Sequence, residues 1–290
     1  MSVIISRNNP QTVLSLGECI SAIGHEVTVW DRETKPIYDM LEEQKPDILF
    51  LEKNDIAEIV YEAIKEYKPT VVLHSAFLPP EMDDTDVVSL ILYEATISEK
   101  IAANISENVP RLPFAPGANL IMTKQGSYDH RFETDVFYYA NISPPYALAE
   151  DYLKIFHQFG IKCAGPTIIP FHNYMGVTNQ KEKYTFFSSA KVSICDSLED
   201  AYTAALCGSV PVLPRQQGVP EVFLTFREAD ELEEKIATNL QNEKLRRKNL
   251  KQAKRHAKEN TYFDRLKALG EILDAGIDLD KVDEIKARFM

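Results

Sequence analysis

The sequence predicts an α/β protein built from two domains in tandem, each a parallel sheet wound with helices. Short apolar, β-branched runs alternate with amphipathic stretches over the first hundred residues, and the same alternation restarts near residue 135. A polar stretch, GSYDHRFET (126–134), separates the two runs. This pattern is typical of Rossmann-like domains, and 290 residues suffice for two of them at about 100–150 residues each.

The first domain is expected over residues 1–125. Apolar residues spaced by three and four support its first helix, which Gly24 ends. Residues 87–107 are expected to be helical or mixed, and the Pro- and Gly-rich stretch 111–120 to be irregular. The expected strands are 2–6, 26–31, 47–52 and 70–75, and the helices between them are 10–23, 37–44 and 55–67.

The second domain is expected over residues 126–270, and a C-terminal helix over 271–290 is expected to cross back to the first domain. Two Rossmann-like units in tandem predict a ligand-binding cleft between them. From Glu228 onward the sequence is strongly helical. The remaining expected strands are 135–140, 190–195 and 210–213, and the expected helices are 145–159, 180–189 and 198–206.

The formal charge of -12 is distributed unevenly. Residues 1–100 contain 19 Asp and Glu against 8 Lys and Arg, whereas the other 190 residues contain 25 acids and 24 bases. A polyanion approaching the first domain would be repelled, which disfavours nucleic acid as a partner there. The basic run EKLRRKNLKQAKRHAKE (243–259) indicates a solvated helix face, with contact to nucleic acid or membrane phosphates as the alternative.

Cysteine usage and hydropathy favour the cytoplasm. None of the four cysteines forms a C-x-x-C pair, and each lies in an apolar context, which predicts buried free thiols. No apolar run approaches the ~20 residues that span a bilayer. The N-terminus lacks a basic region followed by an apolar stretch and a cleavage site.

Three stretches of the second half carry a family resemblance. KYTFFSSAKVSICDSLEDAYTAALCGSVPVLP (183–214) resembles the donor domain of GT-B glycosyltransferases, above all the spore-maturation glycosyltransferase-like group. Its helix 198–206 also resembles the fucosyltransferase and exostosin families. FHNYMGVTNQKEKY (171–184) resembles the loop along the nucleotide base, and ENTYFDRLKAL (259–269) the closing helix of the spore-maturation group. The resemblance implies a GT-B fold and a glycosyltransferase that takes a nucleotide-sugar donor.

The resemblance places the donor at the loop before helix 198–206. Glu199, nine positions before Gly208, matches the acidic residue of the fucosyltransferase pattern and is expected to bind the ribose. Asp196 and Ser197 precede a helix N-terminus, whose N–H groups and positive dipole end suit a diphosphate. The alternative is that Ser197 only caps the helix and Glu199 only stabilises its first turn.

This stretch also departs from the family patterns. Thr203 stands where a widespread pattern has a glutamate, and it is kept as a donor-side residue. Asp200 stands where the fucosyltransferase pattern has a lysine, and an acid there opposes a diphosphate unless it points away. Positive charge for the phosphates must then come from elsewhere, with candidates Lys181, Lys183, Lys191 and Arg215.

Further donor contacts are expected from two loops. Asn141 follows strand 135–140, where the resembling group often has Gly-Asn and this chain has Ala140. Asn173 and Met175 lie in the stretch expected along the base. No D-x-D signature of metal-bridged transferases follows a suitable strand, because the D-T-D at 84–86 lies in an acidic loop, so no essential metal is expected.

The acceptor side is expected from the first domain. His74 ends the fourth strand, at the carboxyl edge where α/β sites form, and its imidazole is a candidate general base for an inverting reaction. A hydrogen-bonded structural histidine is the alternative. Asn8 and Asn9 follow the first strand at the same edge, in a loop without G-x-G-x-x-G.

These observations predict a metal-independent hexosyl- or pentosyltransferase that uses a nucleotide sugar, with UDP-sugars favoured, and an acceptor the sequence does not identify. Two alternatives remain: an inactive GT-B binding module, suggested by Thr203 and Asp200, and a nucleotide-sugar epimerase on the same fold. A modified DNA base is a minority acceptor option, which the acidic first domain disfavours.

Overall fold

The chain folds into two compact units in a computed structural model that describes residues 1–7, 9, 11–52, 55, 57–74, 87–94, 109–124, 126–140, 150–169, 171–216, 218–273 and 276–290. Unit 1 comprises Met1–Pro116 and Tyr262–Arg288, and unit 2 comprises Gly117–Thr261 and Phe289–Met290. From the sequence, the boundary is expected at residue 125 and residues 262–270 in the second domain, whereas they lie in unit 1. Within the described ranges, no helix is both long and apolar enough to cross a bilayer.

Unit 1 contains a six-stranded sheet in the order β2-β1-β3-β4-β5-β6, and every pairing in it is parallel. Its strands are β1 (Ser2–Ser6), β2 (Glu26–Trp30), β3 (Ile48–Glu52), β4 (Thr70–His74), β5 (Leu90–Glu94) and β6 (Arg111–Phe114). Its helices are α1 (Gln11–Ala22), α2 (Ile37–Gln44), α3 (Glu58–Tyr67), α11 (Tyr262–Ile272) and α12 (Leu279–Phe289).

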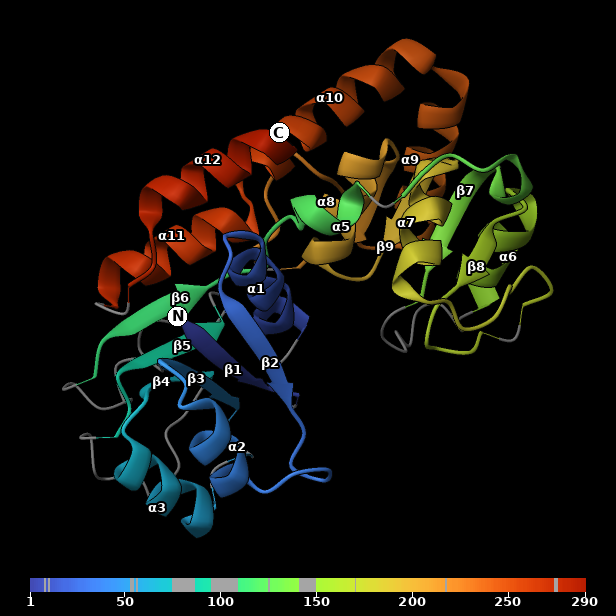
Figure 1. Ribbon diagram of the computed structural model, residues 1–290. Helices are drawn as coiled ribbons and strands as arrows, with labels where there is room; N and C mark the ends of the chain where they lie inside the picture. Colours follow the sequence, from blue (N-terminus) through green and yellow to red (C-terminus); the bar gives the residue numbers. More distant parts are fainter. Residues whose placement is uncertain are drawn as a thin grey trace. The chain divides into compact units, whose positions relative to one another are not determined.

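Helices cover both faces of this sheet. Ile4, Leu49 and Leu51 share one core with residues of α2 and α3, and α1 packs against α11 on the opposite face (Figure 1). Because both faces are buried, the central strands are apolar throughout rather than alternating. Helix α11 belongs to unit 1 although it follows Gly117–Thr261, the long stretch of unit 2, in the chain.

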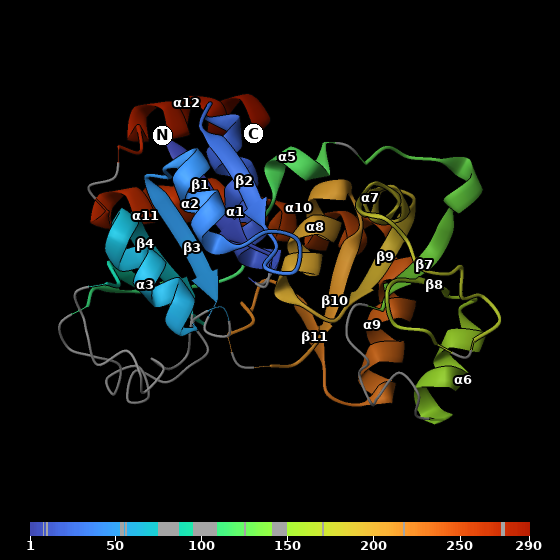
Figure 2. The same cartoon turned by 60° about the horizontal axis from the view of Figure 1, so that its bottom comes forward.

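Unit 2 contains a five-stranded parallel sheet in the order β11-β10-β9-β7-β8. Helices α6 and α9 cover one face, and α7, α8 and α10 cover the other (Figure 2). The strands are β7 (Thr134–Tyr139), β8 (Lys162–Ala164), β9 (Ala190–Cys195), β10 (Val210–Pro214) and β11 (Leu224–Phe226). The helices are α5 (Leu120–Thr123), η3 (His130–Phe132, a 3-10 helix), α6 (Glu150–Gln158), α7 (Gln180–Ser188), α8 (Leu198–Cys207), α9 (Ala229–Gln241) and α10 (Glu243–Glu259).

Two strands were missed in the sequence analysis. The expectation of helical or mixed structure over 87–107 is wrong for its first part, because β5 pairs with β4 and β6. The stretch expected to be irregular contains β6, which tolerates Pro113 because β6 is an edge strand and pairs on one side only. All four cysteines are free thiols as expected, three buried and Cys207 partly so.

Gly165 allows the loop after β8 to approach the end of β7. Its φ is +137°. A Cβ added there would lie 2.4 Å from the Ala140 carbonyl oxygen, and this backbone atom cannot move aside. The Gly165 N–H donates to the Gly176 carbonyl at 3.2 Å, and the Ala140 N–H donates to the Ala164 carbonyl at 2.9 Å. Only glycine fits this crossing of two backbone segments.

We therefore expect Gly165→Ala to lower the free energy of unfolding by about 2–4 kcal/mol, through backbone strain and a clash. Gly160→Ala is the control: φ is +57° there and nothing lies within 4 Å of the added Cβ. It should cost about 1–2 kcal/mol, the strain alone. Urea unfolding of both variants checks this, and equal losses would contradict the clash.

Candidate functional site

The predicted donor residues gather at the carboxyl edge of the unit 2 sheet, where β9 ends and α8 begins. Ser197 is the N-cap of α8, and its Oγ accepts a hydrogen bond from the Asp200 N–H at 3.1 Å. Asp196 is buried, with 7% of its surface exposed, and accepts from the Tyr138 hydroxyl at 3.0 Å. The strand end and the helix start are thus tied to β7 through one carboxylate.

Asp200 points away from this edge and into the protein. It is 1% exposed, forms an ion pair with the Lys183 ammonium of α7, and accepts from the Ser197 hydroxyl at 2.9 Å. Lys183 also lies over the Tyr139 ring, 4.5 Å from its centroid. Burial by itself would lower the pKa of Lys183, but the Asp200 carboxylate outweighs it and the pKa is raised.

This pair changes the set of cations that could meet a diphosphate. Lys183 is occupied inside the fold, and Lys191 is the second residue of β9, at the opposite edge, paired with Asp135 at 2.6 Å. Lys181 is exposed in the first turn of α7, and Arg215 is exposed directly after β10. Of the four candidates, Lys181 and Arg215 are the two that are exposed near the carboxyl edge.

Glu199 and Thr203 lie one turn apart on α8. Glu199 is half-buried in the first turn, where a carboxylate is favoured by the helix dipole. Thr203 is 2% exposed, and its hydroxyl donates to the Glu199 carbonyl at 2.9 Å, so this buried hydroxyl is satisfied within the helix. A donor contact remains a prediction for both residues, and burial makes it harder for Thr203 to reach a ligand.

The predicted base-binding stretch runs alongside β8. The Cys163 N–H donates to the Asn173 carbonyl at 3.1 Å, and the Met175 N–H donates to the Cys163 carbonyl at 2.7 Å. The backbone of 173–175 is therefore fixed, while the Met175 side chain is 46% exposed and that of Val177 71%. This loop presents apolar side chains at the same edge of the sheet as Glu199.

The described part of the unit 1 edge is polar and ordered by hydrogen bonds. Asn9 is buried, and its side-chain amide donates to the carbonyls of Ser6 and Phe50 at 3.1 Å each, which joins the ends of β1 and β3. His74, half-buried at the end of β4, stands in register with Glu52. Asn8, Asn141 and the D-T-D at 84–86 lie outside the described residues.

The Lys183–Asp200 and Tyr138–Asp196 contacts were missed in the sequence analysis. Neither pair has a local sequence signal, because each joins elements that only the tertiary fold brings together. One signal was available in the sequence, because Ser197-x-x-Asp200 matches the S-x-x-[DE] pattern of a helix start. In the structure, Ser197 and Asp200 do form hydrogen bonds with each other.

No family model and no curated protein sequence matches the chain. Solved structures do match in fold. HepE of Anabaena, in complex with UDP and glucose, aligns with a TM-score of 0.67 at 12% identity over 93% of this chain and 98% of that one. The sucrose-phosphate synthase of Thermosynechococcus elongatus aligns with a TM-score of 0.67 at 10% identity, over 94% and 98%.

A putative UDP-N-acetylglucosamine 2-epimerase of Listeria monocytogenes also aligns, with a TM-score of 0.55 at 11% identity over 96% of this chain and 98% of that one. At such low identity these similarities establish the fold alone. The expected fold class, two Rossmann-like α/β domains of the GT-B type with C-terminal helices, is confirmed.

The buried ion pair gives a direct test of how α8 is held. Lys183→Met leaves the buried Asp200 carboxylate without its counter-ion and should cost about 3–5 kcal/mol of stability. The double variant Lys183→Met/Asp200→Leu removes both charges and should recover most of that loss. Denaturant unfolding measures both.

Lys191→Met is the matched control, because the Lys191–Asp135 pair is about half exposed on both sides. Its loss should stay within about 1 kcal/mol, as for surface pairs. A similar cost for Lys183→Met and Lys191→Met would show that the buried pair does not support this region.

Proposed function

We propose that the protein is a glycosyltransferase whose unit 2 binds a nucleotide-sugar donor, with UDP-sugars favoured. The observation that carries this proposal is the start of α8. There Ser197 and Glu199 stand at the carboxyl edge of a parallel sheet, and Lys183 neutralises the Asp200 carboxylate, which would otherwise oppose a diphosphate. A helix N-terminus at this edge is a ready anion site.

Each part of the donor has a proposed partner. The N–H groups of the first turn of α8 and the guanidinium of Arg215 face the phosphates, and the Glu199 carboxylate accepts from the ribose hydroxyls. Asn173 and Met175 lie along the base. A fold neighbour solved in complex with UDP supports a nucleotide donor. The α8 N-terminus and Arg215, rather than a metal, would stabilise the charge that develops on the leaving group.

A thermal-shift panel of UDP, GDP, TDP and CMP with their common sugars tests donor binding. Ligand at 100 times its dissociation constant should stabilise wild type by about 2.7 kcal/mol. Glu199→Ala should abolish most of this shift, because the ribose loses its acceptor. Glu284→Ala, the loss of an exposed carboxylate of α12 in unit 1, is the control and should leave the shift unchanged.

If none of these nucleotides stabilises the wild-type protein, the donor site is refuted. A shift without turnover on any acceptor would favour an inactive binding module. An epimerase, the activity named for one fold neighbour, would convert a free UDP-sugar to its epimer without an acceptor, which sugar analysis of the product detects.

His74 is the proposed general base of an inverting transfer. His74→Gln should lower the transfer rate by about 10²–10⁴-fold, because no group then takes the acceptor proton. Nucleotide-induced stabilisation should not change, since the donor residues lie in unit 2. Steady-state transfer assays measure this once an acceptor is found, and an unchanged rate would remove His74 from the reaction.

A further inference from the structure

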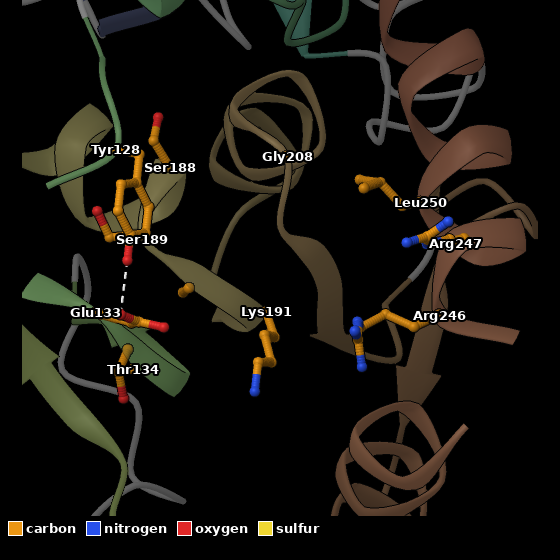
Figure 3. A pocket seen from close by; sticks show the side chains of 11 residues that line it. Tyr128, Glu133, Thr134, Ser188, Ser189, Lys191, Gly208, Arg246, Arg247 and Leu250 are labelled. Atoms are coloured by element: carbon orange, nitrogen blue, oxygen red, sulfur yellow. Dashed lines mark hydrogen bonds between the residues drawn. The ribbon is translucent and has the colours of Figure 1, made fainter. Parts of the chain in front are cut away.

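Unit 2 carries a pocket of about 290 Å³ at the edge of its sheet opposite Glu199 (Figure 3). Thr134 opens β7, Lys191 lies at the start of β9, and Gly208, the C-cap of α8, lies two residues before β10. Because parallel strands all begin at one edge, these residues mark the amino edge. Tyr128, Glu133, Ser188, Arg246 and Arg247 also line the pocket.

One wall of the pocket is cationic. Lys191, Arg246 and Arg247 line it from β9 and α10, as Figure 3 shows. Lys191 pairs with Asp135 at 2.6 Å and Arg247 with Glu243 at 2.5 Å, while Arg246 donates to the Asn239 carbonyl at 3.0 Å. Exposed ion pairs contribute little to stability, so a ligand can replace their partners. Each guanidinium also keeps N–H donors that these contacts do not use.

The helix dipoles of unit 2 explain why several cations can lie close together at this edge. Helices α7 and α8 end at this edge, at Ser188 and Cys207, so the negative ends of their dipoles attract positive charge. Lys244, Lys248 and Lys251 add exposed positive charge on α10, at spacings of three and four. Within the lining itself, the three cations Lys191, Arg246 and Arg247 stand against one carboxylate, Glu133, in a chain whose formal charge is -12.

The facing wall offers a flat aromatic surface. Tyr128 is 60% exposed, and its hydroxyl donates to Glu133 Oε2 at 2.6 Å, which fixes the ring orientation. The hydroxyls of Thr134 and Ser188 lie beside it in the lining. A held ring opposite a group of cations complements a ligand with a planar base at one end and a phosphate at the other.

We propose that this pocket is a second ligand site, which binds a nucleoside phosphate with its phosphate on Lys191, Arg246 and Arg247 and its base on Tyr128. The volume lies at the lower end of small-molecule pockets, which fits a mononucleotide rather than a larger ligand. The site stands apart from the carboxyl edge of the sheet and does not depend on the proposed transfer reaction.

Arginine labelling with phenylglyoxal, resolved by mass spectrometry, tests the site in the intact protein. AMP should slow the modification of Arg246 and Arg247 and leave that of Arg255 unchanged. Arg255 is the internal control, because it lies on the same helix, is exposed and pairs with Glu259 four residues away. Glu199→Ala should show the same protection. Equal labelling with and without AMP would overturn the proposal, and so would protection lost in Glu199→Ala.

Calorimetric titration then measures the contributions of Arg247 and Tyr128 to AMP binding separately. Arg247→Gln should weaken AMP binding about tenfold, the worth of one charge-assisted hydrogen bond, whereas Arg255→Gln should not. Ribose 5-phosphate, which lacks the base, should bind to the wild-type protein about tenfold more weakly than AMP. In the Tyr128→Leu variant, AMP and ribose 5-phosphate should bind with equal affinity. A preference for AMP that survives Tyr128→Leu would overturn the base-on-tyrosine assignment, and AMP binding unaffected by Arg247→Gln would overturn the phosphate site.

Discussion

The buried ion pair between Lys183 and Asp200 is the contact on which the donor-side geometry depends. It joins α7 to α8 beneath the first turn of α8 and removes from the surface a carboxylate that would repel phosphate. Two buried charges are costly to desolvate, so the pair survives only because each satisfies the other and Ser197 and Tyr139 add contacts. The start of α8 thereby offers N–H groups and one half-buried carboxylate, Glu199, rather than two competing acids.

The parallel sheet of unit 2 gives its two edges opposite electrical character. Each helix that follows a strand begins near the carboxyl edge and ends near the amino edge, so dipole ends of one sign gather at each. At the carboxyl edge this favours an anionic ligand directly. At the amino edge it favours Lys191, Arg246 and Arg247, which in turn form a surface for anions. One topological rule therefore underlies both proposed sites.

Much of the fold could be predicted from the sequence, because apolar periodicity is local. The strand DVFYYA and the helix that Gly208 ends are visible in the residues themselves. Strand β5 was missed because its short apolar run, LILYE, suits a buried helix as well as a strand, and β6 was missed because it contains Pro113. The same limit applies to the site. Glu199 was proposed from its spacing to Gly208 and Ser197 from its place before a helix start. The partner of Asp200 lies on another helix and could only be found in three dimensions.

Unit 1 is assembled from two stretches that are separated by the whole of Gly117–Thr261. During synthesis the ribosome therefore completes that central stretch before α11 emerges. Until then, α1 lacks the helix that packs against it. Tyr262, Phe263 and Leu266 of α11 are buried, so they supply the missing apolar surface late. The order of translation then makes unit 2 the earlier to mature. A chain released before α11 would expose α1 and become a target for quality control.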